Sequence, residues 1–285
     1  MKININPFVV LVLLGYGRSM FSKEIIASKI TTPDHSITIF VHGTYPVRKA
    51  LQFSFGRFLM YCPQGLSLAK NLPSYYHFHK MAKGCFDLDS KSYSLDQFYI
   101  FGWKSEHVYD HVRSKSAVDL VGELQHLVSS YYKMHNVIPK VRMIGFSHGG
   151  NVVLHTASYL PLIVNKKTVD IDVWIFGTPV QHANKNLVNS PNFNKVYSFY
   201  SKKDWIQRMD PQGLRNSEIS IKHFWSDRMF DLTDRCIQVE FTVNGYPISH
   251  TYYRSILKYF PTIQKETQKK SQNMNSGCIE VDLKK

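Results

Sequence analysis

Residues 141–154 read VRMIGFSHGGNVVL, and this stretch decides the fold. A run of apolar, strand-forming residues ends in a G-x-S-x-G segment centred on Ser147, and a helical pattern of apolar residues follows it. A serine on a sharp strand-to-helix turn needs small residues two positions before and two positions after it, and Gly145 and Gly149 are those residues. The stretch therefore predicts a strand, a strained turn that presents Ser147, and a helix.

Further strand and helix patterns surround this turn. Short runs rich in β-branched and aromatic residues predict strands at Ser36–Val41, Gln97–Trp103, Lys140–Ile144, Asp172–Phe176, Lys195–Tyr200 and Ile237–Val243. Apolar spacings of three and four predict a helix over Ala117–His135 that buries Val118, Val121, Leu124, Leu127 and Val128. The helix after Ser147 is expected to bury Val152, Val153, Thr156, Ala157 and Leu160. Strands that alternate with helices indicate an α/β fold, with a mostly parallel central sheet and helices on both faces.

Chain length and two irregular stretches set the expected domain organisation. At 285 residues the chain has room for one large α/β domain, which we place at residues 23–263. The stretches 46–94 and 205–234 interrupt the alternation and are candidate lids or caps, because long insertions at strand ends commonly cover substrate sites. Residues 264–285 are polar and lack aromatic side chains, so we expect a flexible tail.

Residues 1–22 resemble a secretory signal peptide or short membrane anchor. Lys2 precedes an apolar run over residues 8–14, and small residues follow at positions 15, 17 and 19. The run is shorter than the roughly 20 residues that a spanning helix needs. We therefore expect export or secretion, with membrane association, a buried first strand and a cytoplasmic location as alternatives.

Composition narrows the classes of partner and cofactor. The formal net charge of +14 suits contact with an anionic membrane surface or general solubility, but the sequence has no RNA-binding aromatic motif and no zinc-finger spacing, so no nucleic-acid partner is expected. The four cysteines form no CxxC pair, and Cys62 and Cys85 are either a loop-closing disulfide or buried thiols. His107 and His111 lack the glutamate of a metalloprotease helix, so neither a metal nor another cofactor is expected.

Ser147 needs a base and an orienting carboxylate to act as a nucleophile at neutral pH. His250 follows the last predicted strand in a loop ahead of a helical stretch, which makes it the best base among 13 histidines. Asp204 lies just beyond the strand predicted at 195–200 and is the preferred acid, with Asp210 as the alternative. The order serine, acid, histidine is the one expected for a nucleophile on this kind of turn.

Two backbone N–H groups are predicted to stabilise the oxyanion of a tetrahedral intermediate. One belongs to His148, directly after the serine. The other belongs to Thr44, in the turn that follows the first predicted strand, with its neighbour Tyr45 as the alternative donor. Gly43 in this turn permits a close backbone approach.

These segments resemble the α/β-hydrolase superfamily, and within it the lipase and esterase-like branch. Residues 42–44 are similar to the oxyanion-strand motif of that family, and residues 145–150 to its nucleophile elbow. Residues 176–179, Phe-Gly-Thr-Pro, are similar to a strand end that often follows the elbow helix in lipase-like members. Residues 101–103 and the two insertions match no lipase subgroup, which leaves the substrate open.

The resemblance covers about residues 36–262 and implies an α/β-hydrolase fold. It also implies a serine hydrolase that cleaves a carboxylic ester through Ser147, His250 and Asp204 and an acyl-enzyme intermediate. The lid-like insertions and basic surface favour a lipid ester. A thioesterase or acyltransferase would use the same triad, and a non-catalytic binding protein would keep the fold without the reaction. The sequence gives no indication of the oligomeric state.

Overall fold

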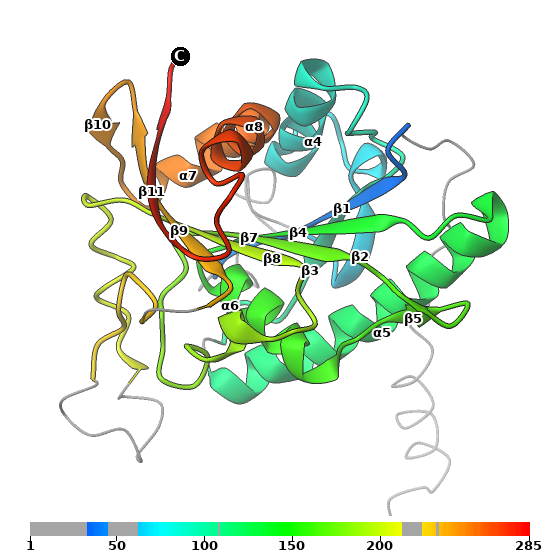
Figure 1. Ribbon diagram of the computed structural model, residues 1–285, viewed down its shortest axis with the longest axis horizontal. Coiled ribbons are helices and arrows are strands. Elements are labelled where there is room, and N and C mark those ends of the chain that lie inside the picture. The colour runs from blue at the N-terminus through cyan, green and yellow to red at the C-terminus, as the bar shows by residue number, and fades with distance from the viewer. Residues whose placement is uncertain (1–32, 45–61, 108, 213–223, 232–233) are drawn as a thin grey trace, which may run out of the picture.

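A mixed sheet with helices on both faces forms the body of the molecule (Figure 1). The structure is a computed structural model, and it describes residues 33–44, 62–107, 109–212, 224–231 and 234–285. Within these residues the main sheet has nine strands in the order β10-β9-β8-β7-β4-β1-β3-β2, and β11 also pairs with β9. The predicted leader, residues 1–22, lies outside the described residues.

The strands that form this sheet include all six predicted from the sequence, each within two residues of its expected bounds. They are β1 (Ser36–Val41), β2 (Gly65–Leu68), β3 (Phe98–Gly102), β4 (Lys140–Phe146), β7 (Ile171–Phe176), β8 (Lys195–Tyr200), β9 (Cys236–Val243), β10 (Tyr246–Pro247) and β11 (Gly277–Leu283). All pairings are parallel except β2 with β3 and β9 with β10. A separate hairpin joins β5 (Ile163–Val164) to β6 (Lys167–Thr168). The α/β fold class is confirmed.

Two helical layers enclose the sheet. One layer contains α5 (Asp110–His135) and α6 (His148–His155), and the other contains α4 (His77–Leu88), α7 (Tyr252–Ile256) and α8 (Phe260–Lys270) (Figure 1). Short 3-10 turns accompany them at Ala69–Asn71, Thr156–Tyr159, Leu187–Asn189 and Leu257–Tyr259. Because side chains alternate along a strand, β1 serves both layers: Ile39 packs on the α5 side and Phe40 on the α4 side.

The predicted helix over 117–135 corresponds to α5, which begins seven residues earlier, at Asp110. It ends where Asn136 adopts a left-handed conformation and donates its N–H to the carbonyl of Tyr132. The prediction that Val118 is buried is wrong, because this side chain is 45 % exposed. Leu120 takes that role, since successive helical residues point about 100° apart and the buried face runs through it and Leu124. The apolar face predicted after Ser147 is buried as expected.

The predicted flexible tail at 264–285 is wrong. α8 continues to Lys270 with Ile263 and Thr267 buried, and β11 pairs in parallel with β9 along its whole length. The domain therefore extends beyond residue 263. The polar composition of residues 264–285 concealed this strand, because only Val281 and Leu283 of β11 are buried and its other residues are half-buried or exposed.

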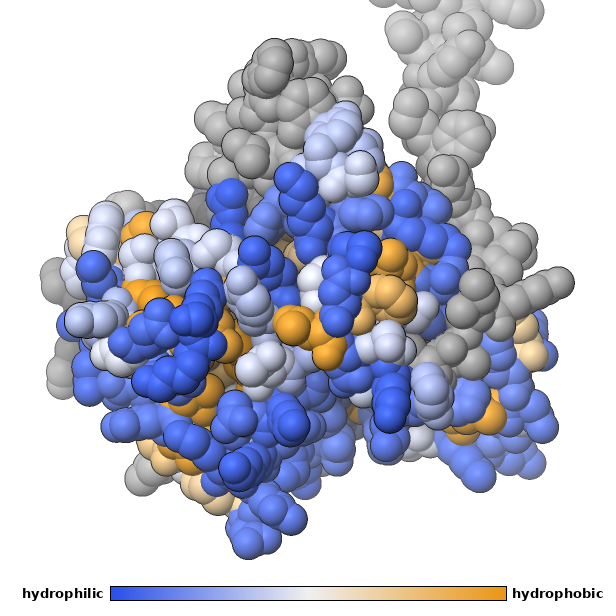
Figure 2. All heavy atoms as spheres, turned by 90° about the horizontal axis from the view of Figure 1, so that it is seen from above, coloured by the Kyte–Doolittle hydropathy of each residue, from blue (hydrophilic) through white to orange (hydrophobic). Residues whose placement is uncertain are grey.

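The upper face of the molecule, over α4 and α8, is largely hydrophilic, with apolar side chains in small groups (Figure 2). The last turn of α8 carries Lys269 and Lys270, where cations interact favourably with the carboxyl end of the helix dipole. The outward side of α8 carries charged residues, while its inward side packs on the core. The polar residues of the outward side therefore concealed the helix in the sequence.

The predicted lid over 46–94 is only partly described, and its described part belongs to the body of the fold. Residues 45–61 lie outside the described residues. Beyond them, β2 pairs antiparallel with β3, and α4 buries Phe78, Met81 and Cys85 against the core. From residue 62 onward, the insertion is therefore wrongly predicted as a lid.

Cysteines and hydropathy add two findings about the described residues. None of the four cysteines, all of which lie within the described residues, forms a disulfide: Cys62, Cys85 and Cys236 are buried thiols, and Cys278 is an exposed one. Burial raises the pKa of the Cys85 thiol to about 12, so it stays protonated at neutral pH.

No helix in the described part of the chain is long and apolar enough to cross a membrane.

His77, at the start of α4, links stability to pH. Burial, aided by the positive charges of Arg254 and Lys80, lowers the pKa of His77 from 6.5 to about 4. Below pH 6.5 the unfolded chain binds a proton at this site that the folded chain does not, so the folded state loses stability as the pH falls toward 4. We expect the loss from this group to be about 2 kcal/mol between pH 7 and pH 5.

Urea unfolding at the two pH values measures this effect. The variant His77→Gln has no imidazole to titrate, and its free energy of unfolding should fall about 2 kcal/mol less than that of the wild type between pH 7 and pH 5. Equal pH dependence in both proteins would show that His77 is not the group responsible.

Candidate active site

Ser147 lies on a strained turn between β4 and α6. Its backbone has φ 53° and ψ −132°, a conformation that residues with side chains rarely adopt. The flanking glycines are required by space: a Cβ on Gly145 would lie 2.5 Å from the Cα of Gly150, and one on Gly149 would lie 2.3 Å from the carbonyl oxygen of Val41. The predicted small residues on each side of the serine are therefore confirmed.

Two further segments close around the same turn. A Cβ on Gly43 would lie 2.9 Å from the Cβ of Ser147, so the turn after β1 is in contact with the serine. A Cβ on Gly150 would lie 1.9 Å from the Oγ1 of Thr178, in the segment that follows β7. Strand ends β1, β4 and β7 therefore meet at Ser147, as the carboxyl ends of adjacent parallel strands do.

His250 bridges Ser147 and Asp204. Its Nε2 lies 2.9 Å from the Oγ of Ser147, and its Nδ1 lies 2.8 Å from the Oδ2 of Asp204. All three side chains are buried, and Asp204 is fully so. The three residues predicted from the sequence are brought together with the histidine between the hydroxyl and the carboxylate.

The carboxylate and the histidine are each held by neighbouring groups. The backbone N–H of Gln207 donates to Oδ1 of Asp204 at 3.0 Å, so each carboxylate oxygen has a hydrogen-bond partner. A Cβ on Gly177, which has φ 56°, would lie 3.0 Å from the Asp204 carboxylate and 3.2 Å from Nδ1 of His250. The glycine of the Phe-Gly-Thr-Pro segment thus leaves room for the contact between the two side chains.

The predicted oxyanion donors lie on either side of the serine. His148 is the first residue of α6, and backbone N–H groups in the first turn of a helix have no acceptor within the helix. Thr44 follows Gly43, which contacts Ser147. Tyr45, the alternative donor, lies outside the described residues.

Asp210, the alternative acid, has a different partner. Its Oδ1 lies 3.1 Å from Nε2 of His148, and its Oδ2 accepts a hydrogen bond from Gln181. Arg113 completes the arrangement with hydrogen bonds to His148 and Gln181. No pattern in the sequence marks Arg113 or Gln181 as functional, because their contact depends on how α5 and the loop after β7 pack together. The structure therefore joins Asp204, and not Asp210, to His250.

A carboxylate at the edge of this arrangement is strongly acidic. Asp110 accepts hydrogen bonds from His155 at 2.9 Å and from Arg113 at 3.2 Å. The hydrogen bond from His155 is the main cause that lowers the pKa of Asp110 to about 2. Asp110 therefore stays ionised at neutral pH and adds a negative charge beside Arg113.

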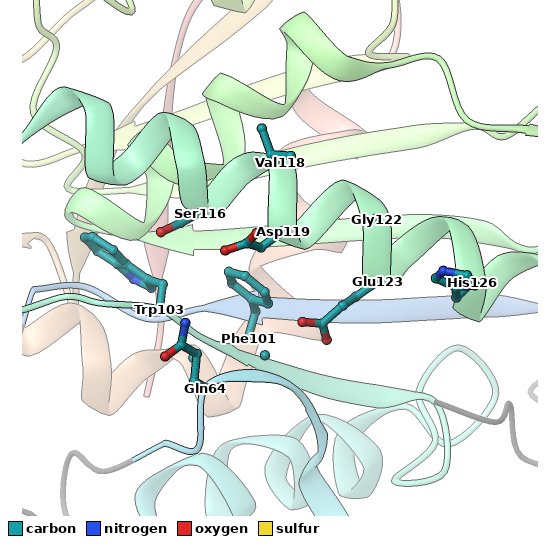
Figure 3. A pocket seen from close by; sticks show the side chains of 11 residues that line it. Gln64, Phe101, Trp103, Ser116, Val118, Asp119, Gly122, Glu123 and His126 are labelled. Carbon is teal, nitrogen blue, oxygen red and sulfur yellow. The ribbon is translucent and has the colours of Figure 1, made fainter. Parts of the chain in front are cut away.

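A separate cavity of about 460 Å³ lies between β3 and α5 (Figure 3). Asp119 and Glu123 of α5 point toward Phe101, and Trp103 lines the cavity while donating its indole N–H to the carbonyl oxygen of His42 at 2.7 Å. No predicted catalytic residue lines this cavity. Within the described ranges, no group of three or more histidine, cysteine, aspartate or glutamate side chains could hold a metal ion.

Comparisons with known proteins give likenesses in structure only. No family model matches the sequence, and no curated protein matches it. Among solved structures, the chain is similar to a lipase-esterase related protein from Clostridium acetobutylicum ATCC 824, with 12 % identity, 90 % of this chain and 88 % of that chain covered, and a TM-score of 0.29.

A second similar structure belongs to work on LipS and LipT, two metagenome-derived lipolytic enzymes. It has 9 % identity and a TM-score of 0.27, with 90 % of this chain and 85 % of that chain covered. The roles of the site residues are therefore argued from the geometry of this chain alone.

Proposed function

We propose that this protein is a serine hydrolase of the α/β-hydrolase superfamily that cleaves a carboxylic ester. The observation that carries the proposal is the position of His250, 2.9 Å from the Ser147 hydroxyl and 2.8 Å from the Asp204 carboxylate. A base between a hydroxyl and a buried carboxylate is the arrangement that activates a serine nucleophile. The strained backbone of Ser147 supports the same role, because such strain is concentrated at functional sites.

The reaction begins when Ser147 Oγ attacks the ester carbonyl carbon and His250 Nε2 takes the hydroxyl proton. Asp204 accepts a hydrogen bond from Nδ1–H of His250, which keeps Nε2 unprotonated beforehand and stabilises the imidazolium afterwards. The tetrahedral intermediate collapses, and His250 gives its proton to the leaving alkoxide, which departs as the alcohol. A water molecule then attacks the carbonyl carbon of the acyl-serine, and His250 takes one proton from it to give a second tetrahedral intermediate. When this intermediate collapses, the bond to Ser147 Oγ breaks, His250 returns the proton to that oxygen, and the acid product leaves.

The negative charge of the tetrahedral intermediate would be stabilised by the backbone N–H groups of His148 and Thr44. Fixed donors aimed at a developing oxyanion lower the barrier by about 3 kcal/mol each, because they need no reorganisation during the reaction. The first turn of α6 adds the positive end of the helix dipole beside the same oxygen. No cofactor is required by this mechanism.

Hydrolysis of p-nitrophenyl butyrate tests the proposed function. The variant Ser147→Ala should lower kcat by about 10⁴-fold or more, since it removes the nucleophile. Ser255→Ala is the matched control, because Ser255 is an exposed serine whose hydroxyl bonds only locally to the carbonyl oxygen of Tyr252, and it should retain wild-type kinetics. If folded wild-type protein hydrolyses no ester, thioester or acyl-transfer substrate, the non-catalytic binding protein is favoured instead.

Exposed apolar side chains beside Asp204 favour a lipid ester as the substrate. Trp205, Met209 and Trp225 are each more than half exposed, and the bridge between Pro211 and Trp225 brings their two stretches together. A cluster of exposed apolar side chains on a protein surface is typical of an interaction site. The overall charge of +14 would attract an anionic membrane surface. The lid proposed at 205–234 includes these residues, although 213–223 and 232–233 lie outside the described residues.

Vesicle binding and hydrolysis test the lipid proposal. Trp205→Ser with Trp225→Ser should weaken binding to vesicles that contain phosphatidylglycerol and lower the rate on long-chain esters at the interface, while the rate on soluble p-nitrophenyl acetate stays within twofold of wild type. Tyr75→Ser is the matched control, because it removes an exposed aromatic side chain elsewhere on the surface, just before α4. A wild-type protein that prefers the shortest ester and gains nothing from an interface would rule out the lipid substrate.

A further inference from the structure

Four buried side chains form a closed ring of hydrogen bonds beside the proposed active site. Arg113 Nη1 donates to Nδ1 of His148 at 3.0 Å, and Nε2 of His148 donates to Oδ1 of Asp210 at 3.1 Å. Arg113 Nη2 donates to Oε1 of Gln181 at 2.6 Å, and Nε2 of Gln181 donates to Asp210 and so closes the ring. None of the four residues is more than 8 % exposed.

The members of the ring come from four different parts of the fold. Arg113 lies in the first turns of α5, His148 begins α6, Gln181 follows β7 and Asp210 follows β8. The ring therefore ties the start of α6, immediately after Ser147, to three segments that are distant in the sequence.

The chemistry of the ring fixes the protonation of His148. Arg113 can only donate, so Nδ1 of His148 must be the acceptor and the imidazole must be neutral. Nε2 then carries the proton that it donates to Asp210, whose carboxylate also accepts hydrogen bonds from Gln181 and from the hydroxyl of Ser226. One cation and one anion are thus linked through two neutral groups that each donate on one side and accept on the other.

Two asparagines connect His148 and Gln181 through a second set of hydrogen bonds. Asn151 Nδ2 lies 3.2 Å from Nδ1 of His148, and Oδ1 of Asn151 accepts from Asn184 at 2.7 Å. Oδ1 of Asn184 in turn accepts from the backbone N–H of Gln181 at 3.0 Å. His148 and Gln181 are consequently held both through the ring and through the asparagines of α6 and the loop after β7.

Stability alone does not account for such a ring. Removing an arginine and an aspartate from water is costly, and well-packed apolar side chains of similar volume commonly stabilise a fold as much or more. The ring instead fixes the direction of one residue, His148, whose backbone N–H is the proposed oxyanion donor. An active site needs this kind of rigidity, because small displacements of a donor cost large factors in rate.

We propose that Arg113, Gln181 and Asp210 are positioning residues that hold His148, and through it the oxyanion donor beside Ser147. This inference rests on the proposed serine hydrolase function. The three residues touch neither the substrate nor the reacting atoms, so their loss should lower kcat while KM stays within about threefold, as expected for an interaction made only in the transition state.

A matched pair of buried arginines separates positioning from folding. Arg113→Lys keeps the charge but cannot donate to His148 and Gln181 at the same time, and we expect kcat to fall about 10- to 100-fold. Arg142→Lys removes a comparably buried guanidinium from β4, where it contacts Thr38 and the ring of Tyr93. Arg142→Lys should lower the free energy of unfolding without lowering kcat.

An exchange of the carboxylate and the amide gives a rescue test. In Asp210→Asn the N–H groups of the new amide face either His148 or Gln181, each of which also donates there. Flipping either amide, or moving the proton of His148 to its other ring nitrogen, leaves at least one of the four hydrogen bonds broken. In Gln181→Glu two carboxylates face each other. The double variant Gln181→Glu with Asp210→Asn has a carboxylate facing Arg113 and an amide between that carboxylate and His148, so the ring can close again.

We expect each single variant to lower kcat about 10- to 100-fold, and the double variant to return to within about threefold of the wild type. The rate at which a fluorophosphonate probe modifies Ser147 should follow the same order. A double variant as slow as the product of the two single losses would overturn the inference, as would folded single variants with wild-type kcat and labelling rate. A wild-type protein that neither turns over esters nor reacts with the probe would instead refute the proposed function itself.

Discussion

Asp204→Asn is expected to lower kcat for ester hydrolysis by about 10⁴-fold while the protein remains folded. The new amide would place N–H groups near Nδ1 of His250, which favours the tautomer with its proton on Nε2, facing Ser147. A protonated Nε2 cannot accept the serine proton, so the base is lost even though the geometry is kept. Steady-state kinetics on p-nitrophenyl butyrate measure the effect, with circular dichroism to confirm folding.

Asp210→Asn is the comparison that makes this prediction specific. Asp210 is also buried and also hydrogen-bonded to a histidine, but that histidine is His148. Its loss should cost about 10- to 100-fold in kcat, far less than the loss of Asp204. The reverse order of the two effects would assign the role of catalytic acid to Asp210.

Gly149→Ala is expected to destabilise the protein by at least about 3 kcal/mol and to abolish esterase activity. The added Cβ would lie 2.3 Å from the carbonyl oxygen of Val41 and 2.4 Å from that of His42. Both obstacles are backbone atoms at the end of β1, so the turn that presents Ser147 would have to move away from the strand. Chemical denaturation and ester hydrolysis measure the two losses.

Gly122→Ala is the matched control for this substitution. Gly122 lies in α5, and a Cβ built there has no heavy atom within 4 Å. Alanine is the better helix former, so this variant should be more stable than the wild type by about 0.5–1 kcal/mol, with unchanged activity. If Gly149→Ala proved equally harmless, the close packing of the turn against β1 would be contradicted.

The turn at Ser147 was predictable because its requirements are local. Strain at the serine demands small neighbours, and the sequence displays them as Gly145 and Gly149. Asp204 and His250 were predictable for a related reason. Asp204 follows β8 and His250 follows the hairpin of β9 and β10, and the carboxyl ends of β8 and β9 lie at the same edge of the parallel sheet as that of β4. The place of each residue just after a strand therefore indicated that its side chain would lie near Ser147.

β11 and α4 were not predicted from the sequence. In β11, Ile279, Val281 and Leu283 alternate with Glu280 and Asp282, which is the pattern of a strand with one buried face. The polar residues that precede β11 outweighed this short alternation. α4 was hidden within a stretch read as a lid, although Phe78, Met81 and Cys85 are spaced as a buried helical face. The polar residues around these three side chains favoured the prediction of a lid over that of a buried helix.

The hydrogen-bonded ring lay beyond the reach of sequence reasoning. Arg113 is separated from Gln181 by 68 positions, and nothing in either residue's neighbours marks it as buried. Only the packing of α5 against α6 brings the guanidinium to His148. Asp210, chosen from the sequence as a second acid, proved to be a member of this ring, so its nearness to a histidine was real although the histidine was a different one.

Peptide mapping of the protein after reaction with a fluorophosphonate probe tests the central claim most directly. The probe requires an activated serine, and the proposed triad predicts a single stoichiometric phosphonate adduct on Ser147, lost in Ser147→Ala and slowed in His250→Ala. Adduct formation on another serine, or a folded protein that takes up no probe, would contradict the assignment of Ser147 as the nucleophile.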